Sequence, residues 1–227
     1  MSFKQFTKEL NGDRVEGELI KTIFYSLLTS FVVIGALYLL VLKNVANFVP
    51  KYGFYLFLLT ISYALIIPVI RQVRAYKQFG CMAGMMIGMT TGMIAGFIGG
   101  YFIGATNGMF IGGLFGMVIG SMLGVWMGSC CGIMGSMEGI MAGFMGGLMG
   151  AMTSVMLLND RLKLATLIIS IFTTIISISL NYMIFFEMKE NERQKKEDHF
   201  TTILITFILI VLTVWLMVFG PRSALFT

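Results

Sequence analysis

The stretch GCMAGMMIGMTTGMIAGFIGGYFIGATNG, residues 80–108, has no charged residue and carries a glycine at every fourth position. The spacing of four continues to Gly132, which makes fourteen consecutive glycines in register, and then slips by one to positions 135, 139, 143 and 147. Glu138 is the one charged residue from Gln78 to Asn159. Backbone amides in a bilayer find no water and must pair within helices. The stretch therefore predicts membrane-embedded helices.

The composition of the whole chain is that of a membrane protein. Of its 227 residues, 57% are hydrophobic and 12% are charged, whereas an ordinary soluble domain has about 25% charged residues. The net charge of +5 comes from lysines and arginines between apolar runs, where they orient a chain in the membrane. We therefore expect an all-α polytopic integral membrane protein that contacts the lipid bilayer and binds no nucleic acid.

The uncharged middle of the chain must fold back on itself. As one helix, the 82 residues from Gln78 to Asn159 would be about 120 Å long, which is about four times the hydrocarbon thickness of a bilayer. The turn candidates are ATNG at 105–108 and GSCCG at 128–132. Turns there predict three transmembrane helices at about 79–104, 108–129 and 134–157, which form a glycine-zipper, methionine-rich core.

The rest of the chain predicts four more helices, about seven in total. We expect a short polar segment at 1–21, two transmembrane helices in 22–70, a basic cytoplasmic loop at 71–77 and the core at 78–158. Residues 159–227 contain two further helices, separated by a charged loop at 187–199. Seven helices with a cytoplasmic N-terminus put eleven of the 16 lysines and arginines inside, as the positive-inside rule favours. Six or eight helices remain open, and we expect the plasma membrane.

Glycines spaced by four let helix backbones approach closely, so that van der Waals contact holds the helices together in lipid. Twenty-two of the 27 glycines lie in residues 80–150. This pattern predicts three tightly packed helices, in one chain or shared between several. The Gly-x3-Gly faces can thus also bind a second copy or a membrane partner.

Sulfur is concentrated in the same core, where sixteen of the 20 methionines lie between Met82 and Met156. In the third core helix the methionines form a stripe roughly opposite its glycines. Thioether and thiolate groups are soft ligands that select Cu(I), whereas the alternative is that methionine is an adaptable packing residue. The candidate metal ligands are Cys81, Met82, Met85, Met89, Met93, Cys130, Cys131, Met134, Met137, Met141, Met145 and Met149.

The seven-helix topology places Cys81, Cys130, Cys131 and Glu138 at one cytoplasmic end of the core. An ionisable side chain inside a membrane indicates a functional site. The alternative for Glu138 is the first turn of the third core helix, with Ser136 as its N-cap, where the helix dipole favours a carboxylate. For the adjacent cysteines, the alternative is two small residues in a turn.

Met85 and Met89 beside Gly84 and Gly88 resemble, over this short segment, the Met-x3-Met and Gly-x3-Gly pattern of the Ctr-type copper transporters. In that family the methionines line a trimeric pore and the glycines pack the helices. The resemblance implies a path for Cu(I). No family is recognised for the chain as a whole.

These patterns favour membrane transport, or membrane-embedded binding, of a soft metal ion such as Cu(I) through a methionine and cysteine pathway in the core. No other cofactor is predicted. One alternative is a structural or channel-forming glycine-zipper protein without a metal, and another is a transporter of a different solute that uses Glu138. We expect no enzyme, because the sequence shows no nucleophile motif, no His/Asp/Glu constellation and no phosphate loop.

Overall fold

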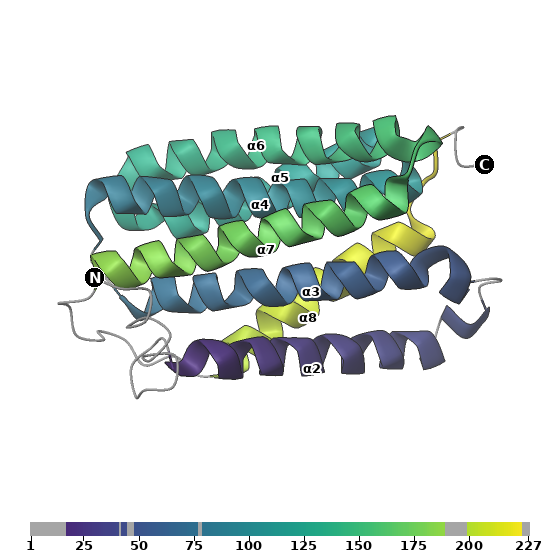
Figure 1. Cartoon of the computed structure of the whole chain (residues 1–227), viewed down its shortest axis with the longest axis horizontal. Coiled ribbons are helices and arrows are strands. Elements are labelled where there is room, and N and C mark those ends of the chain that lie inside the picture. Colours follow the sequence, from purple (N-terminus) through teal and green to yellow (C-terminus); the bar gives the residue numbers. More distant parts are fainter. Residues whose placement is uncertain (1–16, 41, 45–47, 77–78, 189–198, 224–227) are drawn as a thin grey trace.

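The computed structural model describes residues 17–40, 42–44, 48–76, 79–188 and 199–223, and within these ranges the protein is all-α. The helices lie along one long axis (Figure 1). In chain order the elements are α2 (Gly17–Leu40), η1 (Leu42–Asn44), α3 (Phe48–Ala75), α4 (Cys81–Asn107), α5 (Met109–Gly128), η2 (Ser129–Cys131), α6 (Gly132–Met156), η3 (Leu157–Asn159), α7 (Leu162–Glu187) and α8 (His199–Phe219).

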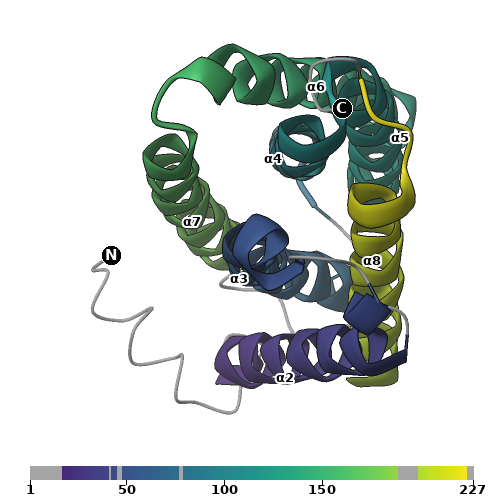
Figure 2. The same ribbon diagram turned by 90° about the vertical axis from the view of Figure 1, so that its right-hand side faces the viewer.

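Successive α-helices run in opposite directions, so that the molecule has two ends. The Cys81 end contains the starts of α2, α4, α6 and α8 and the ends of α3, α5 and α7. The Asn107 end contains the opposite termini of these helices. Helices α4, α5 and α6 form one bundle. Helices α2, α3 and α8 form a second group beside it, and α7 packs against α3 and α4 (Figures 1 and 2).

Six helical stretches in the described residues are long and apolar enough to cross a membrane, which makes the protein an integral membrane protein. The fourth of these, Met109–Asn159, is 51 residues long and folds back at η2, so that α5 and α6 lie side by side. The backbone has positive φ angles at Gly108, between α4 and α5, and at Gly132, after η2. Glycine adopts such angles without a steric cost, and both turns fall in the predicted segments.

The bundle of α4, α5 and α6 packs backbone against backbone. A Cβ atom on Gly116 of α5 would lie 2.6 Å from the carbonyl oxygen of Gly96 in α4, and one on Gly88 would lie 2.7 Å from the Cα atom of Gly128. A methyl group does not fit at these contacts. The spacing of four therefore brings three backbones into direct contact along the bundle axis, and it leaves no room between them for a channel.

Hydroxyl groups join the other helices. The hydroxyl groups of Ser62 in α3 and Ser170 in α7 are 3.1 Å apart, and those of Ser26 in α2 and Thr206 in α8 are 3.3 Å apart. The Tyr101 hydroxyl of α4 lies 3.1 Å from that of Thr166 in α7. Such pairs stabilise helix association in membranes only modestly.

Helix α3 continues through Ala75, so that Arg71 and Arg74 lie in its last turns rather than in a separate loop at 71–77. Arg71 is 3% exposed, and its Nη2 lies 2.8 Å from Oε2 of Glu18. Its Nη1 donates to the Thr22 hydroxyl at 3.1 Å. The Glu18 carboxylate of α2 thus allows helix α3 to continue through Arg71, whose charge is buried. Most of the polar segment at 1–21 and of the loop at 187–199 lies outside the described residues.

Candidate functional site

The fold brings the three cysteines together at the Cys81 end. Cys81 is the first residue of α4, and Cys130 and Cys131 lie in η2 between α5 and α6. The Cys131 thiol donates a hydrogen bond of 2.8 Å to the carbonyl oxygen of Cys81. All three are free thiols. The contact joins residues that are 50 positions apart in the sequence.

Gly84 makes room for this thiol cluster. A Cβ atom on Gly84 would lie 2.9 Å from the Cβ of Cys131 and 3.0 Å from the Sγ of Cys130. Both side chains therefore lie against the bare backbone of the first turn of α4. The Cys130 thiol also donates to the carbonyl oxygen of Met127 at 3.3 Å, at the end of α5. Other glycines of the bundle allow two helix backbones to touch, whereas Gly84 leaves room for two cysteine side chains.

Glu138 lies in α6 and is half-buried, within electrostatic range of the Cys131 thiol. The alternative interpretation, with Ser136 as N-cap, is wrong, because α6 already begins at Gly132 and Ser136 donates to the carbonyl oxygen of Gly132 at 3.0 Å. The helix starts early because Gly132 takes the positive φ angle that ends η2. Glu138 therefore occupies the second turn of α6 and caps nothing.

The thiol cluster is not a complete metal site. Within the part of the chain that the structure describes, no three His, Cys, Asp or Glu side chains are placed so as to hold a metal ion. A soft ion between thiols would take its other ligands from thioethers, which suit Cu(I). Met82 and Met134 are exposed beside the cluster in sequence, and Met85 is half-buried.

The remaining candidate thioethers lie on the outside of the glycine bundle. They are exposed because the glycines of α4 and α6 face the bundle axis, and the methionines occupy other faces of the same helices. Met93 lines a cavity against Ile169 and Phe172 of α7, whereas the other methionines face outward from the chain and line no interior path. These residues are Met89, Met93, Met137, Met141, Met145 and Met149.

The chain matches no family model, no curated protein and no solved structure. The assignment of a function therefore rests on the chemistry and geometry of the site itself.

The structure shows two polar contacts that the sequence patterns above do not predict. The first is the ion pair of Glu18 and Arg71 described above. Its signal was a polar residue at every fourth position of α2, beginning at Glu18 and continuing through Thr22, Ser26 and Ser30. The second is Asn107, which is 1% exposed and donates from Nδ2 to the carbonyl oxygen of Leu216 in α8 at 2.7 Å.

Proposed function

We propose that this protein binds a soft metal ion of the Cu(I) type at the Cys81 end and moves it across the membrane. The observation that carries the proposal is the contact between Cys131 and the start of α4 at Cys81, with Cys130 packed on Gly84. Three sulfur atoms from two distant segments gather there in a chain that contains only three cysteines. Thiolate and thioether groups favour such an ion over hard cations.

The proposal includes seven membrane crossings, with α5 and α6 as separate crossings and the Cys81 end in the cytoplasm. Helix α5, the shortest, has 20 residues, and at 1.5 Å per residue it is about 30 Å long, enough to cross the hydrocarbon layer. The cytoplasm keeps thiols reduced, so that the three cysteines remain available as ligands. Basic residues at this end agree with the positive-inside rule.

The metal ion moves along the methionines on the outside of the glycine bundle, because the bundle has no interior channel. The stripe of α6 from Met137 to Met149 runs from near the thiol cluster toward the Asn107 end. A second copy of the chain that packs against this stripe supplies the other wall of a thioether path. Ions pass along such a path when each site binds weakly enough to release them.

A second candidate function is a glycine-zipper scaffold without a metal. It is supported by the same exposed methionines, since Met141 is 60% exposed and Met145 is 52% exposed and a lipid-facing methionine needs no ligand. In that case sulfur is only an adaptable packing group. The two candidate functions predict different effects on metal binding and uptake when the cysteines and methionines are replaced.

The test is competition for Cu(I) or Ag(I) between the purified full-length chain and a chelator of known affinity. We expect Cys81→Ser with Cys131→Ser to weaken binding by about tenfold or more, which corresponds to a loss of at least about 1.4 kcal/mol. Met141, Met145 and Met149 changed together to leucine should slow ion uptake into vesicles without altering the melting temperature. Met183→Leu with Met217→Leu, in α7 and α8, is the matched control. Unchanged metal binding and uptake in both test variants would leave the scaffold function.

A further inference from the structure

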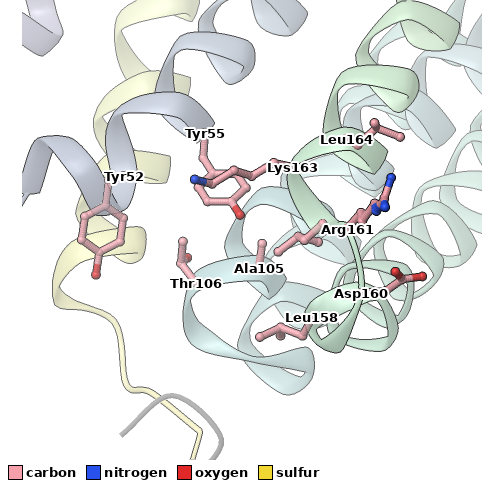
Figure 3. A pocket seen from close by; sticks show the side chains of 10 residues that line it. Tyr52, Tyr55, Ala105, Thr106, Leu158, Asp160, Arg161, Lys163 and Leu164 are labelled. Atoms are coloured by element: carbon pink, nitrogen blue, oxygen red, sulfur yellow. The ribbon is translucent and has the colours of Figure 1, made fainter.

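A cavity with charged residues in its walls lies at the Asn107 end, at the opposite end of the helices from the thiol cluster. Its volume is about 640 Å³, which falls within the range of about 300–1,000 Å³ that is typical of ligand pockets. Three parts of the fold line this open cavity: the first turns of α3 at Tyr52 and Tyr55, the last turn of α4 at Thr106, and residues 158–164 at the start of α7 (Figure 3). A site here is independent of the proposed metal function.

The charged side of the cavity is basic. Lys163 extends from the first turn of α7 toward Tyr55, whereas the Asp160 carboxylate and the Arg161 guanidinium point away from Tyr55 (Figure 3). The first turn of α7 contains no acidic residue, and no side chain caps it. The positive end of the helix dipole and the lysine ammonium therefore act on the same space, and both favour an anion.

Residues with hydrogen-bond donors line the same cavity. Helix α7 begins at Leu162, whose amide donates to the Asp160 carbonyl, and the amide of Ala165 donates to the Arg161 carbonyl. The amides of Lys163 and Leu164 between them have no acceptor within the helix. The Tyr55 hydroxyl, on a half-buried side chain, points into the cavity and has no hydrogen-bond partner among the described residues (Figure 3). The Lys163 ammonium thus lies toward the Tyr55 ring (Figure 3), and the residues that carry the two amides line the same cavity.

The remaining walls, at Ala105, Leu158 and Leu162, are apolar. The cavity lies where the helices α3, α4 and α7 end or begin, which is the level of lipid head groups for helices that cross a bilayer. We propose that this cavity binds a phosphate group through Lys163, Tyr55 and the first amides of α7. The tetrahedral phosphate accepts hydrogen bonds from several directions, as at other helix N-termini. The phosphate belongs either to a phospholipid or to a soluble ion.

The test uses the full-length chain, purified in detergent and stripped of lipid. Binding of phosphatidic acid, of diacylglycerol with the same acyl chains, and of inorganic phosphate is measured by native mass spectrometry and by the shift in melting temperature. We expect phosphatidic acid to bind at least about tenfold more tightly than diacylglycerol, because a charge-assisted hydrogen bond is worth at least that factor. If inorganic phosphate binds as well as phosphatidic acid, the proposal stands and the ligand is a soluble phosphate.

Lys163→Gln with Tyr55→Phe should abolish the preference for phosphate, and Arg161→Gln should keep it. Arg161→Gln removes the same charge from a side chain that lines the cavity but points away from Tyr55 and Lys163 (Figure 3), and so it controls for non-specific attraction. Tyr55→Phe alone, which loses one oxygen atom, should weaken binding in the same direction and tests the site if the double variant does not fold. The proposal is overturned if no phosphate preference exists, or if Lys163→Gln and Arg161→Gln weaken binding equally.

Discussion

Gly96 of α4 and Gly143 of α6 lie so close together that a Cβ atom on Gly96 would fall 2.7 Å from the carbonyl oxygen of Gly143. These two helices run in the same direction, and α5 is antiparallel to them and packs against both. In lipid, apolar side chains gain little by leaving the solvent, so that helices associate through close van der Waals contact. The glycine contact therefore holds this bundle together where a leucine face would not.

Gly96→Ala should destabilise the protein, because the new methyl group meets backbone atoms that cannot rotate away. Overpacking of this kind costs about 1–3 kcal/mol. The control is Gly35→Ala in α2, where no atom lies within 4 Å of the added Cβ and alanine should raise stability by up to about 1 kcal/mol. Melting temperatures in detergent compare the two variants. Equal effects would show that the bundle is packed more loosely than the structure has it.

Glu18→Gln should also destabilise the protein, because Arg71 keeps a buried charge whose counter-charge is lost. Removing one partner of a buried polar pair costs about 1–3 kcal/mol, and the low end is expected because Glu18 is 27% exposed. The double variant Glu18→Leu with Arg71→Leu should lose less than the sum of the two single changes. Denaturant unfolding of the four proteins measures the coupling. Strict additivity would contradict the ion pair.

The sequence was sufficient to predict the class of protein and both turns of the core. These predictions rest on the spacing of the glycines and on the length of the uncharged stretch, which involve only residues close together in the sequence. Periodicity also placed the methionine stripe of α6 opposite its glycines. That this stripe faces outward could not be predicted, because it depends on the glycines facing the bundle axis. The extension of α3 could not be predicted from hydropathy, because Arg71 is tolerated through Glu18, which lies 53 positions away. The cavity at Lys163 likewise depends on three distant segments.

The hydroxyl pair of Ser62 and Ser170 should contribute little. Its oxygen atoms are 3.1 Å apart, but such hydrogen bonds between membrane helices average about 0.6 kcal/mol, because the separated helices find other partners. A double-mutant cycle with Ser62→Ala and Ser170→Ala should therefore give a coupling well below the cost of Gly96→Ala. A coupling above about 2 kcal/mol, beyond the largest such values in membranes, would indicate that α7 is held by hydroxyl groups rather than by packing.

Asn107→Ala should loosen the joint between α4 and α8. Asn107 lies in the predicted turn segment at 105–108. Its Nδ2 donates to the Leu216 carbonyl, its Oδ1 accepts from Thr106, and its own carbonyl oxygen accepts from the Ser223 amide. Loss of the side chain leaves buried groups unsatisfied and costs about 1–3 kcal/mol. Asn159→Ala, at an exposed position of η3, is the control. Hydrogen exchange should rise at residues 216–223 in the first variant alone, and no rise there would contradict the joint.

Seven crossings require the two ends of the chain to lie on opposite sides of the membrane. Helix α2 begins at the Cys81 end, and α8 ends at the Asn107 end, near Arg222, whose Nη2 donates to the Tyr52 hydroxyl at 2.7 Å. We expect a reporter at the N-terminus to be cytoplasmic and one at the C-terminus to lie outside. In intact cells a membrane-impermeant maleimide should then spare Cys81 but label a cysteine introduced at Asn159. Reporters on the same side would instead mean an even number of crossings and would contradict the seven-crossing topology.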